Sequence, residues 1–194
     1  LRTDFAETAF FVPALQSNAQ GDMEIGFTLP QSLTAWRFQA IAHDEWMNWG
    51  TLDTTVVAQK DFMLQPHLPR FIRQGDHTVV TATLRNLTGQ SLDGTATMLL
   101  TDAESGHTLG RHRLDFSVGA DTTTTLSFNL PDVKTGPLLI CRLTAEAGRF
   151  ADGEEHYLPV LSETETSITA TPFSIAGRTD TVIDLPAQRA ARTT

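Results

Sequence analysis

Apolar and polar side chains alternate with a period of two through the central part of this chain. This spacing is typical of strands that bury one face, and Gly, Asn, Asp and Pro residues separate the segments as turns do. The predicted strands and their inward residues are Thr78–Leu87 (Val80, Ala82, Leu84), Gly94–Thr101 (Ala96, Met98, Leu100), His112–Val118 (Leu114, Phe116, Val118), Thr122–Leu130 (Leu126, Phe128, Leu130) and Leu138–Ala147 (Leu139, Cys141, Leu143, Ala145).

Two further segments complete this pattern. A connecting strand is expected around Phe62-Met63-Leu64, and a last strand is expected at His156–Leu161. Seven strands over roughly a hundred residues favour a β-sandwich of immunoglobulin or fibronectin III type. The best helix candidate, Ala187–Arg192, is short and polar, so the predicted fold class is all-β.

The first 55 residues predict shorter strands. Thr8–Leu15 is apolar but contains Pro13, which indicates an edge strand or a bend, and Met23–Leu29 alternates cleanly. Trp36–Ala42 also alternates, so Trp36 is expected in the core. In the loop His43–Gly50, Trp46 and Trp49 either cap that core or are exposed.

Composition narrows the classes of partner. The 194 residues carry 14 Lys and Arg against 23 Asp and Glu, a formal net charge of -9, which disfavours nucleic acid and anionic membrane surfaces. No apolar run approaches the ~20 residues that span a bilayer. Because the chain starts at Leu1 without Met, we expect it to be a piece of a longer protein.

Candidate catalytic and metal-binding residues do not form a recognisable pattern. The single cysteine, Cys141, excludes an internal disulfide and alternates with Leu139 and Leu143, which predicts a buried thiol. Glu154 and Glu155 fall in the apparent turn Asp152–Glu155, so we expect a solvated hairpin tip. We therefore predict no catalytic residue, metal site or cofactor. The scattered histidines, expected at the surface or rim, are His43, His67, His77, His107, His112 and His156.

Three other features allow a binding role. The run Pro69–Asp76 mixes Arg and aromatic residues, but a corner with a turn at Gly75-Asp76 is favoured. Asn86-Leu87-Thr88 is a formal glycosylation sequon. Trp46 and Trp49 could stack on sugars, which keeps an adhesin-like or carbohydrate-binding module as the alternative function.

Several stretches together resemble the alpha-2-macroglobulin family, in particular its bacterial branch. Phe5-Ala6-Glu7-Thr8-Ala9-Phe10-Phe11 is similar to the segment that follows the bait region in protease-trapping members. Pro30-Gln31-Ser32-Leu33-Thr34-Ala35-Trp36 resembles the family's P-x-S-L-T-x-W stretch. The likeness covers essentially Arg2 to Leu161. Ala6 and Phe11 depart from the Pro and Trp of other members, which fits a bacterial relative.

The resemblance implies a layout and a role. Residues 1–55 would be the latter part of one macroglobulin-like sandwich, residues 56–161 a complete one, and residues 162–194 a linker with the first strands of a CUB-like domain. Members inhibit endopeptidases by closing around them after bait cleavage, and many add a thioester from a Cys-x-Glu-Gln motif. Cys141 is followed by Arg142-Leu143-Thr144, so no thioester is expected in this chain.

The resemblance also implies partners and a location. The partners would be target proteases and the neighbouring macroglobulin-like, CUB-like and thioester domains. The location would be the periplasm or cell envelope, with or without a lipid anchor, or otherwise the extracellular space. Unpaired strands at Ala9–Val12 and Met23–Leu29 would also promote self-association through their edges.

Overall fold

A computed structural model describes residues 1–133, 136–162, 168, 170, 172 and 177. These described residues contain strands and no helix, as the all-β prediction required. The strands are β1 (Ala35–His43), β2 (Trp49–Val57), β3 (Phe62–His67), β4 (Ile72–Arg73), β5 (Val79–Asn86), β6 (Leu92–Asp102), β7 (Thr108–Val118), β8 (Thr123–Asn129), β9 (Leu138–Ala147) and β10 (Phe150–Leu161).

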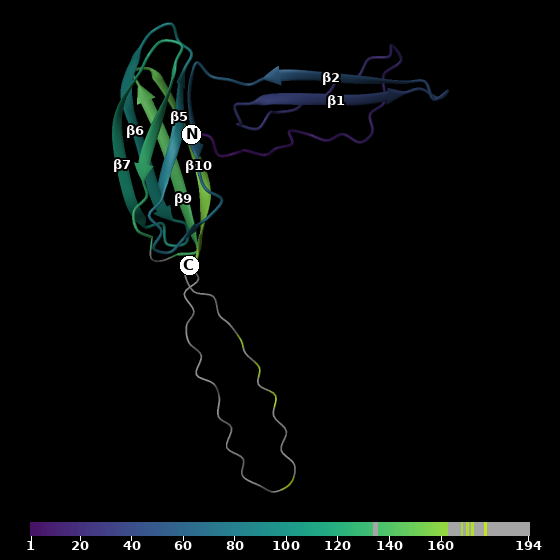
Figure 1. The fold of residues 1–194 in the computed structure, drawn as a ribbon. Coiled ribbons are helices and arrows are strands. Elements are labelled where there is room, and N and C mark those ends of the chain that lie inside the picture. The colour runs from purple at the N-terminus through teal and green to yellow at the C-terminus, as the bar shows by residue number, and fades with distance from the viewer. Residues whose placement is uncertain (134–135, 163–167, 169, 171, 173–176, 178–194) are drawn as a thin grey trace.

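Strands β3 to β10 form a two-layer sandwich (Figure 1). One layer has the order β4-β10-β9-β6-β7 and the other has the order β3-β5-β8. All pairs are antiparallel except β4 with β10, which are parallel. The two apolar inner faces meet between the layers, as expected for alternating strands of a sandwich.

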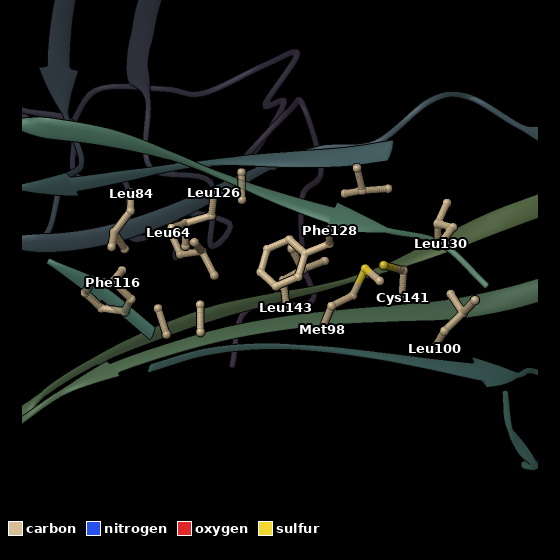
Figure 2. Close-up of a cluster of buried hydrophobic side chains, with 14 of the residues drawn as sticks. Leu64, Leu84, Met98, Leu100, Phe116, Leu126, Phe128, Leu130, Cys141 and Leu143 are labelled. Carbon is tan, nitrogen blue, oxygen red and sulfur yellow. The ribbon is translucent and has the colours of Figure 1, made fainter. Parts of the chain in front are cut away.

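The predicted inward residues build this core. Figure 2 shows Leu64, Leu84, Leu126 and Phe128 from the three-stranded layer facing Met98, Phe116, Cys141 and Leu143 from the five-stranded layer. The inward side chains predicted for the strands between residues 78 and 147 are all buried except Leu114, which is partly buried and packs against the core. The period-two pattern therefore placed the core correctly.

Strands β1 and β2 form a separate antiparallel hairpin that projects from the sandwich (Figure 1). The register pairs Trp36 with Val56 and Phe38 with Thr54, so these side chains share one face. Phe10 covers part of that face, since its ring centre lies 5.9 Å from Phe38 and 4.3 Å from Phe27. A small aromatic cluster therefore forms under the hairpin.

Two predictions for the first 55 residues are wrong. Thr8–Leu15 and Met23–Leu29 form no strand, because an extended segment becomes a strand only when a neighbour supplies its hydrogen bonds. Trp36, which lies in β1, is half-buried and does not belong to the sandwich core; its indole Nε1 is buried and has no hydrogen-bond partner among the described residues. Most of the predicted segment 162–194 lies outside the described residues.

Candidate functional site

The N-terminal residues lie against the edge of β10. The amide of Arg2 donates to the carbonyl of Gly153 at 2.8 Å, and the amide of Glu155 donates to the carbonyl of Arg2 at 3.0 Å. These bonds make a parallel bridge between Arg2 and Glu154. The start of the chain thus joins the edge of the five-stranded layer through an isolated β-bridge.

The side chain of Arg2 enters the sandwich beside β3 and β10. Its Nη2 lies 2.8 Å from Oδ2 of Asp152 and 2.7 Å from Oε1 of Glu154, and its Nε donates to Oδ1 of Asp152 at 3.2 Å. Nη2 also lies 2.9 Å from the carbonyl oxygen of Leu64, and Nη1 donates to the carbonyl of Gln31 at 3.3 Å. Only 6% of Arg2 is exposed, so its charge is almost fully removed from water.

Asp152 is the centre of this site. Besides Arg2, it accepts a hydrogen bond from Nζ of Lys60 at 2.8 Å and one from the amide of Leu64 at 3.0 Å. Burial by itself raises the pKa of Asp152, but the bonds from Arg2, Lys60 and Leu64 outweigh it and leave the pKa below its ordinary value. The carboxylate is therefore the stable form in the folded chain.

His156 extends the network toward the surface. Its Nε2 lies 2.6 Å from Oε2 of Glu154, and its ring stacks on Phe5 with centres 4.5 Å apart and an interplanar angle of 14°. Gln31 holds the segment between Arg2 and Phe5, since its Oε1 accepts from the amides of Thr3 and Asp4 at 2.7 and 3.1 Å. Residues 2 to 5 are thus bound through backbone, charge and aromatic contacts.

This site corrects one prediction. Asp152–Glu155 is not a hairpin tip, because β10 begins at Phe150 and the turn lies at Gly148 and Arg149, where Gly148 has a positive φ of 58°. Asp152 and Glu154 are buried, whereas a solvated tip would expose them. A signal was present in the sequence: Asp152, Glu154 and His156 continue the period of Leu158 and Val160 onto the same face.

The other histidines lie apart from this site. His43, His67, His77 and His107 are exposed and His112 is half-buried, in line with the predicted surface or rim positions. Among the residues that the structure describes, no three His, Cys, Asp or Glu side chains are grouped to hold a metal ion. Cys141 is buried as predicted, and burial raises the pKa of its thiol to about 12, which keeps it protonated at neutral pH.

The remaining candidates have structural surroundings. Asn86 is fully buried, and its side-chain amide donates to the carbonyls of Gln90 and Gly119, both at 2.8 Å. The sequon asparagine therefore anchors a turn inside the sandwich. The run Pro69–Asp76 forms the favoured corner, in which Gly75 has a positive φ of 80° and Asp76 accepts from the amide of Arg73.

The hairpin carries a group of exposed apolar side chains. Trp46 and Trp49 are 79% and 75% exposed, so they do not cap a core. Arg37 and Asp53 form an ion pair on one face of the hairpin, while the opposite face carries the aromatic cluster. Other exposed apolar residues of the hairpin are Ile41, Met47, Leu52, Val56 and Val57. The described residues contain no helix long and apolar enough to cross a membrane.

Comparisons with known proteins point to one family. Residues 8–98 match the alpha-2-macroglobulin family. The chain is 33% identical over 90 residues to an alpha-2-macroglobulin homolog of Nostoc sp. and 32% identical over 92 residues to an alpha-2-macroglobulin of Thermotoga maritima. A third relative, an alpha-2-macroglobulin of Xylella fastidiosa, is 26% identical over 157 residues, or 77% of this chain.

The fold has a solved counterpart. Escherichia coli alpha-2-macroglobulin activated by porcine elastase superposes on 84% of this chain with a TM-score of 0.61 and 15% identity, which supports the macroglobulin-like sandwich. The matched segments are small parts of these proteins. The chain spans 5%, 6% and 9% of the three sequence relatives and 15% of the solved chain.

Proposed function

Because this chain belongs to the alpha-2-macroglobulin family, we propose that it is a non-catalytic scaffold segment of a broad-range endopeptidase inhibitor. In this role it transmits the effect of bait cleavage to the parts of the protein that enclose the protease. The observation that carries the proposal is the family match over residues 8–98, which runs from the N-terminal segment through the hairpin to β6 of the sandwich.

The proposed domain layout follows the same resemblance. Residues 1–55 form the latter part of one macroglobulin-like sandwich, residues 56–161 form a complete one, and residues 162–194 begin a CUB-like domain. The exposed apolar residues of β1 and β2 support the first assignment, because a hairpin with so much apolar surface has the character of an unfinished sheet.

The chemistry of covalent capture does not belong to this segment. Cys141 has no glutamine three residues later, and its thiol is buried between the layers with a pKa of about 12. Target proteases and the neighbouring macroglobulin-like, CUB-like and thioester domains are the proposed partners. The proposed location is the periplasm or cell envelope, with or without a lipid anchor, or the extracellular space.

Trapping can be tested with the protein expressed from its full reading frame. After mixing with an endopeptidase, we expect cleavage of a large protein substrate to fall while cleavage of a small peptide substrate persists, because enclosure excludes only large substrates. Substitution of Cys141→Ala should leave this inhibition unchanged if the segment is non-catalytic. Undiminished cleavage of the large substrate would contradict the proposal.

A carbohydrate-binding module is the second candidate, and one observation favours it. Trp46 and Trp49 lie near each other in sequence at the exposed end of the hairpin, where indole faces can stack on sugars. Binding to a glycan array that is lost in the variant with Trp46→Ala and Trp49→Ala would support this function. An absence of glycan binding by the unaltered chain would exclude it.

A further inference from the structure

The Arg2 site consists of a slot and an occupant that lie far apart in the chain. Asp152 and Glu154 belong to β10 and the carbonyl of Leu64 belongs to β3, so the sandwich supplies most of the slot. The occupant, Arg2, is 150 positions away from Asp152 in sequence. The slot is therefore built by one unit of the molecule and filled by a segment outside it.

The geometry of the slot suits a guanidinium group. Asp152 accepts hydrogen bonds from both Nε and Nη2 of Arg2, which makes a two-point contact. Glu154 forms an ion pair with the same Nη2 through its Oε1. A planar fork of donors can make these contacts together, whereas a lysine ammonium is a single point charge. Without Arg2, Asp152 would keep its ion pair with Lys60 and the hydrogen bond from the amide of Leu64, and Glu154 would keep its contact with the half-buried His156.

The neighbouring contacts add a second level of recognition. Backbone hydrogen bonds to Gly153 and Glu155 require an extended segment, as in recognition by strand addition. Three residues after Arg2, the ring of Phe5 stacks on His156. An extended peptide with arginine and an aromatic residue at this spacing therefore meets every contact that the slot offers.

We propose that the slot between β3 and β10 is an arginine-docking site for an extended Arg-x-x-Phe strand. This chain fills the site with its own residues 1–5, and the site accepts the same sequence from a separate peptide when Arg2 is missing. The inference concerns binding within the sandwich and does not depend on protease inhibition.

The test uses the full chain carrying Arg2→Ala and a fluorescent peptide with the sequence of residues 1–5. We expect saturable binding by fluorescence anisotropy, at least tenfold weaker for the peptide with Arg2→Ala and also weaker for the peptide with Arg2→Lys. Adding Asp152→Asn to the chain should remove this preference. The unaltered chain should bind at least tenfold more weakly, because its slot is occupied.

Equal binding of the arginine and alanine peptides would overturn the proposal. A preference for the arginine peptide that persists in the chain with Asp152→Asn would also overturn it. A second measurement covers the case in which the Arg2→Ala chain does not fold. In the Arg2→Lys chain, hydrogen exchange at the amide of Glu155, which donates to Arg2, should be at least tenfold faster than in the unaltered chain. The amide of Val160, which donates to Pro137, serves as the control. Equal protection of Glu155 in both chains would exclude arginine-specific docking.

Discussion

Arg2 is the residue whose side chain forms ion pairs with two carboxylates inside the sandwich. Asp152 and Glu154 have side chains that are 1% and 8% exposed, and both lie within 2.8 Å of Nη2 of Arg2. Removing one partner of a buried ion pair leaves the other charge without compensation, which costs more than the pair contributes. We therefore expect substitution of Arg2 to have a large effect on the stability of the fold.

We expect Arg2→Ala to lower the free energy of unfolding by about 3–5 kcal/mol, the range for a buried charge pair that loses one partner. Urea denaturation followed by fluorescence measures the change. The matched control is Arg37→Ala, which breaks the exposed pair with Asp53 and should have a much smaller effect, because solvent screens that pair. Equal losses for both variants would contradict the role of burial.

The stability of the site should depend on pH through Asp152. Its pKa is lower in the folded chain than the unfolded value of about 3.9, so the folded state binds this proton less readily. The stabilisation is present above the unfolded pKa and is lost as pH falls through the folded pKa. Unfolding measured at several pH values should show the unaltered chain losing its advantage over Asp152→Asn below about pH 4. A difference that stays constant down to pH 2 would contradict this assignment.

At the scale of elements, close approach between strands restricts side-chain size. A Cβ added to Gly94 in β6 would lie 2.1 Å from the carbonyl oxygen of Glu146 in β9 and 2.7 Å from the Cζ atom of Phe116. Backbone atoms of a central strand cannot move aside without breaking the ladder. The strand pair β6–β9 therefore needs glycine at this position.

We expect Gly94→Ala to destabilise the sandwich by about 1–3 kcal/mol, as overpacking does. Thermal unfolding by circular dichroism measures the effect. Gly89→Ala is the matched control, since Gly89 lies in a loop with no atom within 4 Å of an added Cβ. A melting temperature for Gly94→Ala equal to that of the control would contradict the close approach.

The burial of individual strands explains which of them could be predicted from the sequence. Alternation located β5 to β9 well, because each of these strands buries one face against the opposite layer. It misplaced the start of β10, since Asp152, Gly153 and Glu154 have the composition of a turn. The pairing of β2 with β1 was not predicted either, because β2 is exposed along its whole length and its side chains show no alternation of buried and exposed positions.

The candidate site was missed for a different reason. Arg2 and Asp152 meet across 150 positions, and no local pattern reports a contact of that range. The spacing of Asp152, Glu154 and His156 on one strand face was visible in the sequence. What a single sequence lacks is the identity of the cation that would compensate these charges.

At the scale of the whole molecule, the hairpin is the part that we expect to associate with another chain. Among the described residues, neither edge of its two-stranded sheet pairs with a further strand, and Ile41 and Leu52 are 78% and 55% exposed. Open edges with apolar side chains are templates for pairing with another chain. The structure thus moves the expected site of self-association from Ala9–Val12 and Met23–Leu29 to β1 and β2.

We expect gel filtration of this 21.2 kDa chain to show larger species as concentration rises. Charges introduced on the hairpin by Ile41→Lys and Leu52→Lys should suppress them, since charged side chains block edge pairing. The control is Tyr157→Lys, which adds a charge at an exposed position of β10. A strict monomer at high concentration would contradict the prediction.

The hydrogen bond from Arg2 to the carbonyl of Leu64 affects how the hairpin is held on the sandwich. The hairpin leaves the sandwich through residues 58–61, directly before β3, and the start of the chain returns to β3 at Leu64. Residues 2–64 therefore form a loop that this hydrogen bond closes on β3, and the contacts of Arg2 with Asp152, Gly153 and Glu154 attach the start of the same loop to β10. Force applied to the hairpin would then reach the sandwich by two routes, through the covalent connection into β3 and through the contacts of Arg2 with β10.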